Sequence, residues 1–152
     1  MTEPRRPAAA AAQPHLVVLL ARGAGEYRKA VRGRLKRSGF DDVPRSGSWL
    51  LTALIESPAT VGELAVRLGT TKQGLSRLSD AMVERGYLRR SSDPSDHRLV
   101  RLSLAPRGQS AAECIFAAVA EVDRAVNRRA GRGGRAAAER ALRAAFGAPD
   151  QP

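Results

Sequence analysis

Residues 60–108, TVGELAVRLGTTKQGLSRLSDAMVERGYLRRSSDPSDHRLVRLSLAPRG, decide the fold of this chain. Thr60 and Glu63 have the spacing of a capping box, and the apolar residues after them recur at the interval of one helix face. Gly69 ends this first helix, and Gly86 ends the helix that follows it. A short helix, a tight turn, a second helix and a basic ribbon therefore follow in order. This order predicts a winged helix-turn-helix, a shape that places a helix in the DNA major groove.

The ribbon is expected to be a hairpin of two short strands. Its first strand is predicted at 87–90, and its second at 99–104, where apolar residues alternate with Arg101 and Ser103. The polar residues 91–98 form the tip of the hairpin. These strands form a small β-wing on a mostly α chain, so the fold class is α+β.

The rest of the chain predicts helices on both sides of this segment. The predicted helix over 15–38 carries an apolar stripe, with Gly23 and Gly25 as a site of bending. A nearly all-apolar helix between Ser46 and Ile55 should be buried. After the ribbon, Pro106 suits the first turn of a helix that runs to about residue 129, and a last Ala-rich helix follows. We expect one domain over 15–147 and tails at 1–14 and 148–152.

The chain has 152 residues, a formal net charge of +11 and a pI of about 11.4. Such an excess of positive charge fits nucleic acid or another anionic surface as a partner, although it also aids solubility. Cys114 is the only cysteine, so no intrachain disulfide forms, and an inert buried thiol is expected. His15 and His97 stand far apart, without the neighbours that a metal site needs.

The sequence indicates no catalytic site. It holds no Gly-rich phosphate loop, no paired carboxylates in a cleft pattern and no defensible nucleophile–base set. We therefore expect no enzymatic activity and no cofactor. No apolar stretch approaches the length of a membrane span, and no signal peptide is recognised, so a cytoplasmic location is expected.

The segment resembles the MarR family of bacterial transcription regulators. The match is strongest at 86–90, at the Asp-His-Arg triplet 96–98, and at Leu104 and Gly108. The family has a Gly-hydrophobic step, a basic strand, Asp-x-Arg at the wing and Leu-Thr-x-x-Gly, and every spacing is kept. Ala105 departs from this pattern, because the family usually has Thr there to cap the next helix. The absence of this threonine should cost roughly 1 kcal/mol of local stability.

The resemblance implies a homodimer in which the first and last helices of the two subunits interlock. In this chain those helices are the predicted ones over 15–38 and 106–147, and the DNA-binding lobe is 46–104. The implied function is a dimeric repressor that binds double-stranded DNA at an inverted-repeat operator. The resemblance also leaves open a small-molecule effector that relieves repression.

The candidate DNA-binding residues fall into two groups. The first lies on or before the second helix of the motif, where hydroxyl, amide and cationic groups reach phosphates and base edges. The second lies on the ribbon, where the resemblance assigns Arg98 to the minor groove and Asp96 to an ion pair that shapes the wing. The complete set is Thr70, Thr71, Lys72, Gln73, Ser76, Arg77, Arg89, Arg90, Asp96, Arg98 and Arg101.

Two alternatives accompany this hypothesis. A winged helix that binds protein instead of DNA would show a neutral or acidic recognition face. The residues that argue against it are Lys72, Arg77, Arg98 and Arg101. The aromatic side chains of Tyr27, Phe40, Trp49 and Phe116 are compatible with a ligand cavity, although core packing is expected for each.

Overall fold

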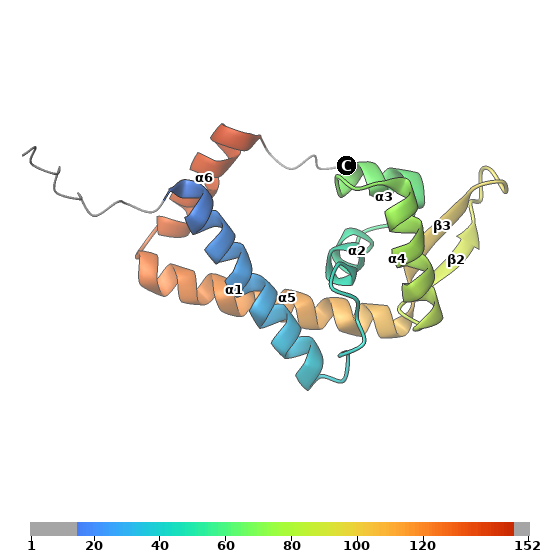
Figure 1. Cartoon of the computed structure of the whole chain (residues 1–152), viewed down its shortest axis with the longest axis horizontal. Coiled ribbons are helices and arrows are strands. Elements are labelled where there is room, and N and C mark those ends of the chain that lie inside the picture. The colour runs from blue at the N-terminus through green and yellow to red at the C-terminus, as the bar shows by residue number, and fades with distance from the viewer. Residues whose placement is uncertain (1–14, 148–152) are drawn as a thin grey trace, which may run out of the picture.

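The computed structural model describes residues 15–147, so the predicted tails 1–14 and 148–152 lie outside the described residues. Within this range the chain forms six helices and one three-stranded sheet, which confirms a mostly α fold with a small β-wing (Figure 1). In chain order the elements are α1 (Leu16–Arg37), α2 (Gly47–Ala53), β1 (Ala59–Thr60), α3 (Val61–Arg67), α4 (Lys72–Glu84), β2 (Leu88–Ser92), β3 (Val100–Leu104), α5 (Pro106–Ala130) and α6 (Gly134–Phe146).

Helix α5 runs through the whole molecule and organises the other elements. Figure 1 shows α1 crossing α5, with α6 and the start of α1 both at one end of the long axis. At the other end lie α3, α4 and the β2–β3 ribbon, while α2 packs on α5 between the two ends. Helix α1 is continuous from residue 16 to residue 37, so Gly23 and Gly25 do not interrupt it.

The sheet has the order β1-β3-β2, and both pairings are antiparallel. Strand β1 was not predicted, because its two residues are too few to show an alternating pattern; Ala59 lies opposite Leu102. The first strand of the ribbon extends further than predicted, since Ser92 still pairs with Val100. The tip of the wing is therefore 93–99.

The core lies under the helix-turn-helix, between α2, the wing and the first half of α5. The largest fully buried side chains there are Leu50, Leu51, Leu64, Leu75, Met82, Tyr87 and Leu102. Helix α2 ends at Ala53, so Ile55 is outside it and exposed. Cys114 is half-buried against this core.

The start of α5 is pressed against the entry to β2. The Ala105 N–H donates to the Tyr87 carbonyl oxygen at 2.9 Å. A Cβ on Gly108 would lie 2.0 Å from that same oxygen, so only glycine allows this approach. Ala105 is the N-cap of α5 in extended conformation, and it has no side-chain oxygen to accept from the first turn.

We predict that Ala105→Thr stabilises the protein by about 1 kcal/mol, because a hydroxyl at this N-cap would accept a free N–H of α5. Urea unfolding of both proteins measures the difference. Ala105→Val is the matched control, because it has the same shape without the hydroxyl. A threonine variant no more stable than the valine variant would show that capping does not limit this helix.

Candidate nucleic-acid interface

Helix α4 presents one polar face to solvent because its opposite face is fixed in the core. Leu75, Ser79 and Met82 are buried at the spacing of a single helix face. On the outer side, Lys72, Gln73 and Arg77 are exposed, and Ser76 is half-buried. The predicted residues of this helix therefore lie together on one accessible surface.

The start of α4 offers hydrogen-bond donors to an anion. Thr71 is the N-cap, and its hydroxyl oxygen accepts from the Gly74 N–H at 3.1 Å. Thr70 and Lys72 are exposed beside it. The remaining free N–H groups and the positive end of the helix dipole favour a phosphate oxygen at this position.

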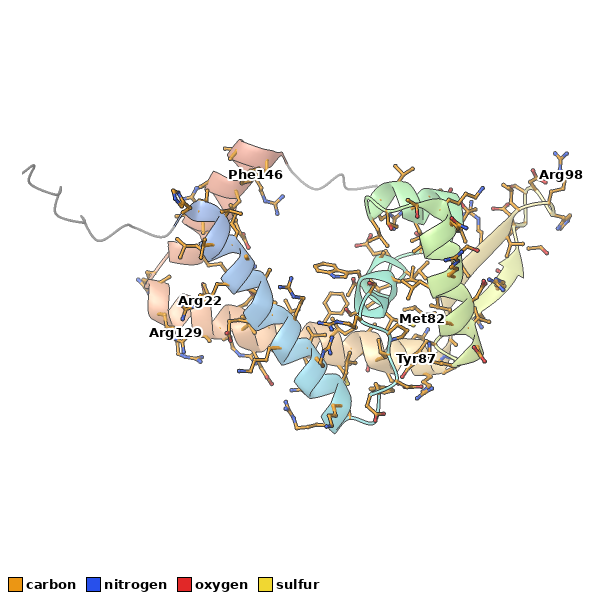
Figure 2. The ribbon with its side chains drawn as sticks, viewed as in Figure 1. Arg22, Met82, Tyr87, Arg98, Arg129 and Phe146 are labelled. Atoms are coloured by element: carbon orange, nitrogen blue, oxygen red, sulfur yellow. The ribbon has the colours of Figure 1, made fainter. Side chains whose placement is uncertain are left out.

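The tip of the wing carries Arg98 far into solvent, where Figure 2 shows it at the extreme of the ribbon. Its side chain is 90% exposed, and its Nε lies 3.2 Å from the Asp96 carboxylate. The Arg98 backbone N–H also donates to Asp96, at 3.0 Å. Asp96 therefore orients Arg98, while the assignment of Arg98 to the minor groove stays a prediction.

Sequence reasoning missed Asp93, which is the buried anchor of the wing. Its carboxylate accepts from the Ser95 N–H at 2.7 Å, the Ser95 hydroxyl, the Asp96 N–H and the Arg101 Nε. The Ser95 hydroxyl bond, followed by the bond from Arg101, holds the pKa of Asp93 far below its usual value. The Asp-Pro-Ser-Asp run is a turn signal that could have identified it.

Arg101 connects the wing to the start of the helix-turn-helix. It pairs with Asp93, donates to the Pro58 carbonyl oxygen at 3.1 Å and lies 3.7 Å from Glu63. The hydrogen bond to Asp93 is the main cause of its raised pKa. This geometry makes Arg101 a positioning residue, and its predicted contact with phosphate stays a prediction.

Two further arginines of the ribbon are tied to neighbouring elements. Arg90 pairs with Asp80 of α4, which connects the wing to the exposed side of that helix. The Arg89 Nε donates to the Ser103 hydroxyl at 3.0 Å across the ribbon. Both residues remain exposed, so they are accessible to a phosphate backbone.

The four aromatic residues do not form one cluster. Phe40 packs on Tyr87 at a ring distance of 6.3 Å, and Tyr27 donates to Asp123 at 2.5 Å. Burial is the main cause that raises the pKa of Tyr27 to about 12. Core packing was the wrong expectation for Trp49 and Phe116, which are 64% and 45% exposed in the single chain.

The described residues offer neither a metal site nor a membrane-spanning helix. Among residues 15–147, no group of three or more His, Cys, Asp or Glu side chains could hold a metal ion. No helix in this part of the chain combines the length and apolar character needed to cross a membrane.

Comparisons with known proteins agree with the architecture. The model of the MarR family matches residues 41–99, which run from before α2 to the end of the wing tip. A search of curated proteins gave no match. This match confirms the resemblance seen in the sequence over residues 41–99, and the solved structures show that the chain shares their fold.

Three of those structures illustrate the likeness. Reduced MarR from E. coli has a TM-score of 0.71 at 19% identity, with 88% of this chain and 98% of that chain covered. A MarR mutant from E. coli complexed with operator DNA has a TM-score of 0.71 at 20% identity, covering 86% and 93%. A MarR family protein from Mycobacterium tuberculosis in complex with salicylic acid has a TM-score of 0.62 at 24% identity, covering 89% and 98%.

We predict that Asp93→Asn destabilises the protein at neutral pH, because asparagine keeps the acceptor for Ser95 but removes the charge that holds Arg101. A lowered native pKa stabilises the fold above 3.8, the ordinary pKa of Asp, and this contribution is lost as the pH falls below it. The difference in melting temperature between wild type and variant should therefore shrink in acid. Asp41→Asn, an exposed carboxylate, is the control. A difference that stays constant down to about pH 2 would contradict this role.

Proposed function

We propose that this chain is a dimeric, sequence-specific DNA-binding transcription regulator that acts as a repressor. The observation that carries the proposal is the exposed polar face of α4 beside a wing whose tip ends in Arg98 (Figure 2). A protein-binding winged helix has no need of cationic and amide groups at these positions. The proposal is also supported by the shared fold with a MarR mutant complexed with operator DNA.

In the proposed complex, α4 lies in the major groove and the wing lies along the adjacent minor groove. Gln73 and Arg77 have the side chains that bond adenine and guanine edges bidentately. Thr70, Thr71 and Lys72 at the helix start bind the flanking phosphate. Arg98 suits the concentrated negative potential of a narrow, A·T-rich minor groove.

The dimer is proposed from apolar surface that a single chain leaves uncovered. Leu16, Val17, Val18 and Leu19 at the start of α1 are at least half exposed, and Phe146 at the end of α6 is 69% exposed. Figure 1 places the start of α1 and helix α6 at the same end of the molecule. Surface of this kind is typical of an interface, and a second copy of the same end would bury it.

We expect a homodimer in sedimentation equilibrium at micromolar concentration, because two copies of this apolar end bury one another. The operator should then be an inverted repeat whose half-sites lie about 34–36 Å apart. Footprinting of the bound DNA measures the spacing of the half-sites. A clean monomer, or protection of a single asymmetric half-site, would count against the dimer.

Relief of repression by a small molecule is the finer part of the proposal. A groove of about 380 Å³ lies between the segment 54–58 after α2, the ribbon and α5, and Arg89, Ser103 and Gln109 are on its walls. A small molecule bound there would contact the strands of the wing directly. The support from comparison is a structure of similar fold in complex with salicylic acid. Loss of DNA binding on titration with salicylate tests it, and unchanged binding would remove this effector from the proposal.

We predict that Arg98→Ala weakens DNA binding without changing the melting temperature, since the side chain is exposed and bonds only to its neighbour Asp96. Loss of one ionic contact per subunit should flatten the plot of log K against log salt by about 1, hence about 2 per dimer. The loss should be larger for sites with A·T-rich flanks.

Two variants serve as controls for this measurement. Asp96→Ala should weaken binding less, because Asp96 orients the wing without contacting phosphate. Arg45→Ala removes an equal charge from the loop before α2 and should leave the salt slope unchanged. If Arg98→Ala keeps wild-type affinity and slope, the wing does not reach DNA and the proposed binding mode is wrong.

A further inference from the structure

The positive charge of the chain is concentrated away from the winged helix. Residues 38–120, which include α4 and the wing, hold ten Arg and Lys against nine Asp and Glu, a net charge of +1. Helix α1 and residues 121–147 together hold fourteen Arg and Lys against four Asp and Glu, a net charge of +10. We call these two stretches together the basic end. Nearly all the charge that suggested an anionic partner therefore lies in the basic end.

Most cations of the basic end have no acidic partner. Arg34 pairs with Glu121 at 2.6 Å, and Arg135 pairs with both Asp123 and Glu139. Three of the four carboxylates are thereby used. Within residues 15–147, the cations of the basic end that form no ion pair are Arg22, Arg28, Lys29, Arg32, Lys36, Arg37, Arg124, Arg128, Arg129, Arg132, Arg140 and Arg143.

Three of these cations line one groove between two helices. A groove of about 600 Å³ separates α1 from the second half of α5, with Lys29, Arg37 and Arg129 on its walls. Glu26 and Glu121 line it as well, and Glu121 is already paired with Arg34. Figure 2 shows Arg22 of α1 and Arg129 of α5 at this same end of the molecule.

A second copy of the chain does not neutralise this surface. The dimer proposed above joins two ends that each carry +10, so dimerisation concentrates positive charge. A helix face that is merely solvated usually mixes both signs, which avoids self-repulsion. The basic end departs from this pattern, and an anionic partner would relieve the repulsion.

We propose that the basic end is a second, sequence-independent binding surface for the phosphate backbone of duplex DNA. Ten of the twelve unpaired cations are arginines, whose planar forks bind phosphate bidentately. Figure 1 places α6 and the end of α5 at the opposite end of the long axis from α4 and the wing. The proposal assigns the duplex bound there to a second segment of DNA, which the protein bridges to the segment that α4 contacts. This inference rests on the proposed function for the segment contacted by α4.

The test captures two duplexes on one protein. A duplex selected by the protein from a random pool is immobilised and saturated with protein, and a fluorescent duplex of random sequence is then added. We expect wild type to retain the second duplex, with retention falling at least tenfold between about 50 and 200 mM salt. A triple variant replaces three exposed arginines by glutamine: Arg128→Gln, Arg129→Gln and Arg132→Gln. It should retain at least tenfold less of the second duplex than wild type. Its affinity for the immobilised duplex should change less than twofold.

Arginine-to-lysine changes at the same three positions are the matched control, since they keep the charge and should keep most of the retention. Failure of wild type to retain the second duplex, or equal retention by the glutamine variant, would overturn the proposal. Retention of polyglutamate in place of the duplex would also overturn it and would indicate an acidic protein segment as the partner.

A further variant separates this proposal from the proposed function. This triple variant removes the cations of α4 and the wing tip but leaves the basic end intact. Its substitutions are Lys72→Ala, Arg77→Ala and Arg98→Ala. It should still bind random duplex in a salt-dependent manner. If the random pool gives no consensus sequence, the proposed function fails while binding through the basic end remains measurable. If this variant binds no duplex at all, the basic end is not a DNA surface.

Discussion

Tyr87 lies where the winged helix meets the long helix α5, and the relative position of these two parts depends on its contacts. Its ring is fully buried against Phe40, its hydroxyl donates to Asp42 at 2.5 Å, and the Arg107 guanidinium lies 4.3 Å from the ring centre. Its carbonyl oxygen accepts from the chain just before α5 and leaves room only for glycine at position 108. One residue therefore fixes the loop before α2, the entry to the wing and the first turn of α5.

The elements that could be predicted from sequence are those with a local physical cause. The capping box of α3 forms as expected, with the Thr60 hydroxyl and the Glu63 carboxylate each accepting from the other's backbone N–H. Gly69 and Gly86 adopt the positive φ that makes glycine favourable after a helix end. The elements that could not be predicted depend on partners far away in the chain. Strand β1 exists only because β3 lies beside it.

The residues of the candidate site also divide into those with a local physical cause and those that depend on distant partners. The exposure of Lys72, Gln73 and Arg77 follows from the helical period, since Leu75 and Met82 hold the opposite face of α4 in the core. By contrast, the Asp-Pro-Ser-Asp run indicates a turn at Asp93, but the pairing of Asp93 with Arg101 could not be predicted, because it depends on how the ribbon folds back toward β1. The exposure of Trp49 was missed for a related reason, because an apolar helix indicates burial without indicating whether its own chain provides the cover.

The distribution of charge gives the two ends of the molecule different physical characters. The end with α4 and the wing has nearly balanced charge, and its ion pairs, such as Arg90 with Asp80, hold side chains in defined positions. This favours geometric recognition at short range. The basic end has few internal ion pairs and a large net charge, which favours attraction over a longer range that salt screens.

Helix α5 connects these two ends without a break over its 25 residues. At 1.5 Å per residue it is a rod of about 37 Å, so a tilt of about 5° at one end displaces the other end by about 3 Å. A displacement of that size is close to one base-pair step of a duplex. In the proposed dimer, the angle between the two α5 helices would therefore set which spacing of half-sites the protein accepts, and a small change of that angle would be enough to move the two wings out of register with the proposed DNA site.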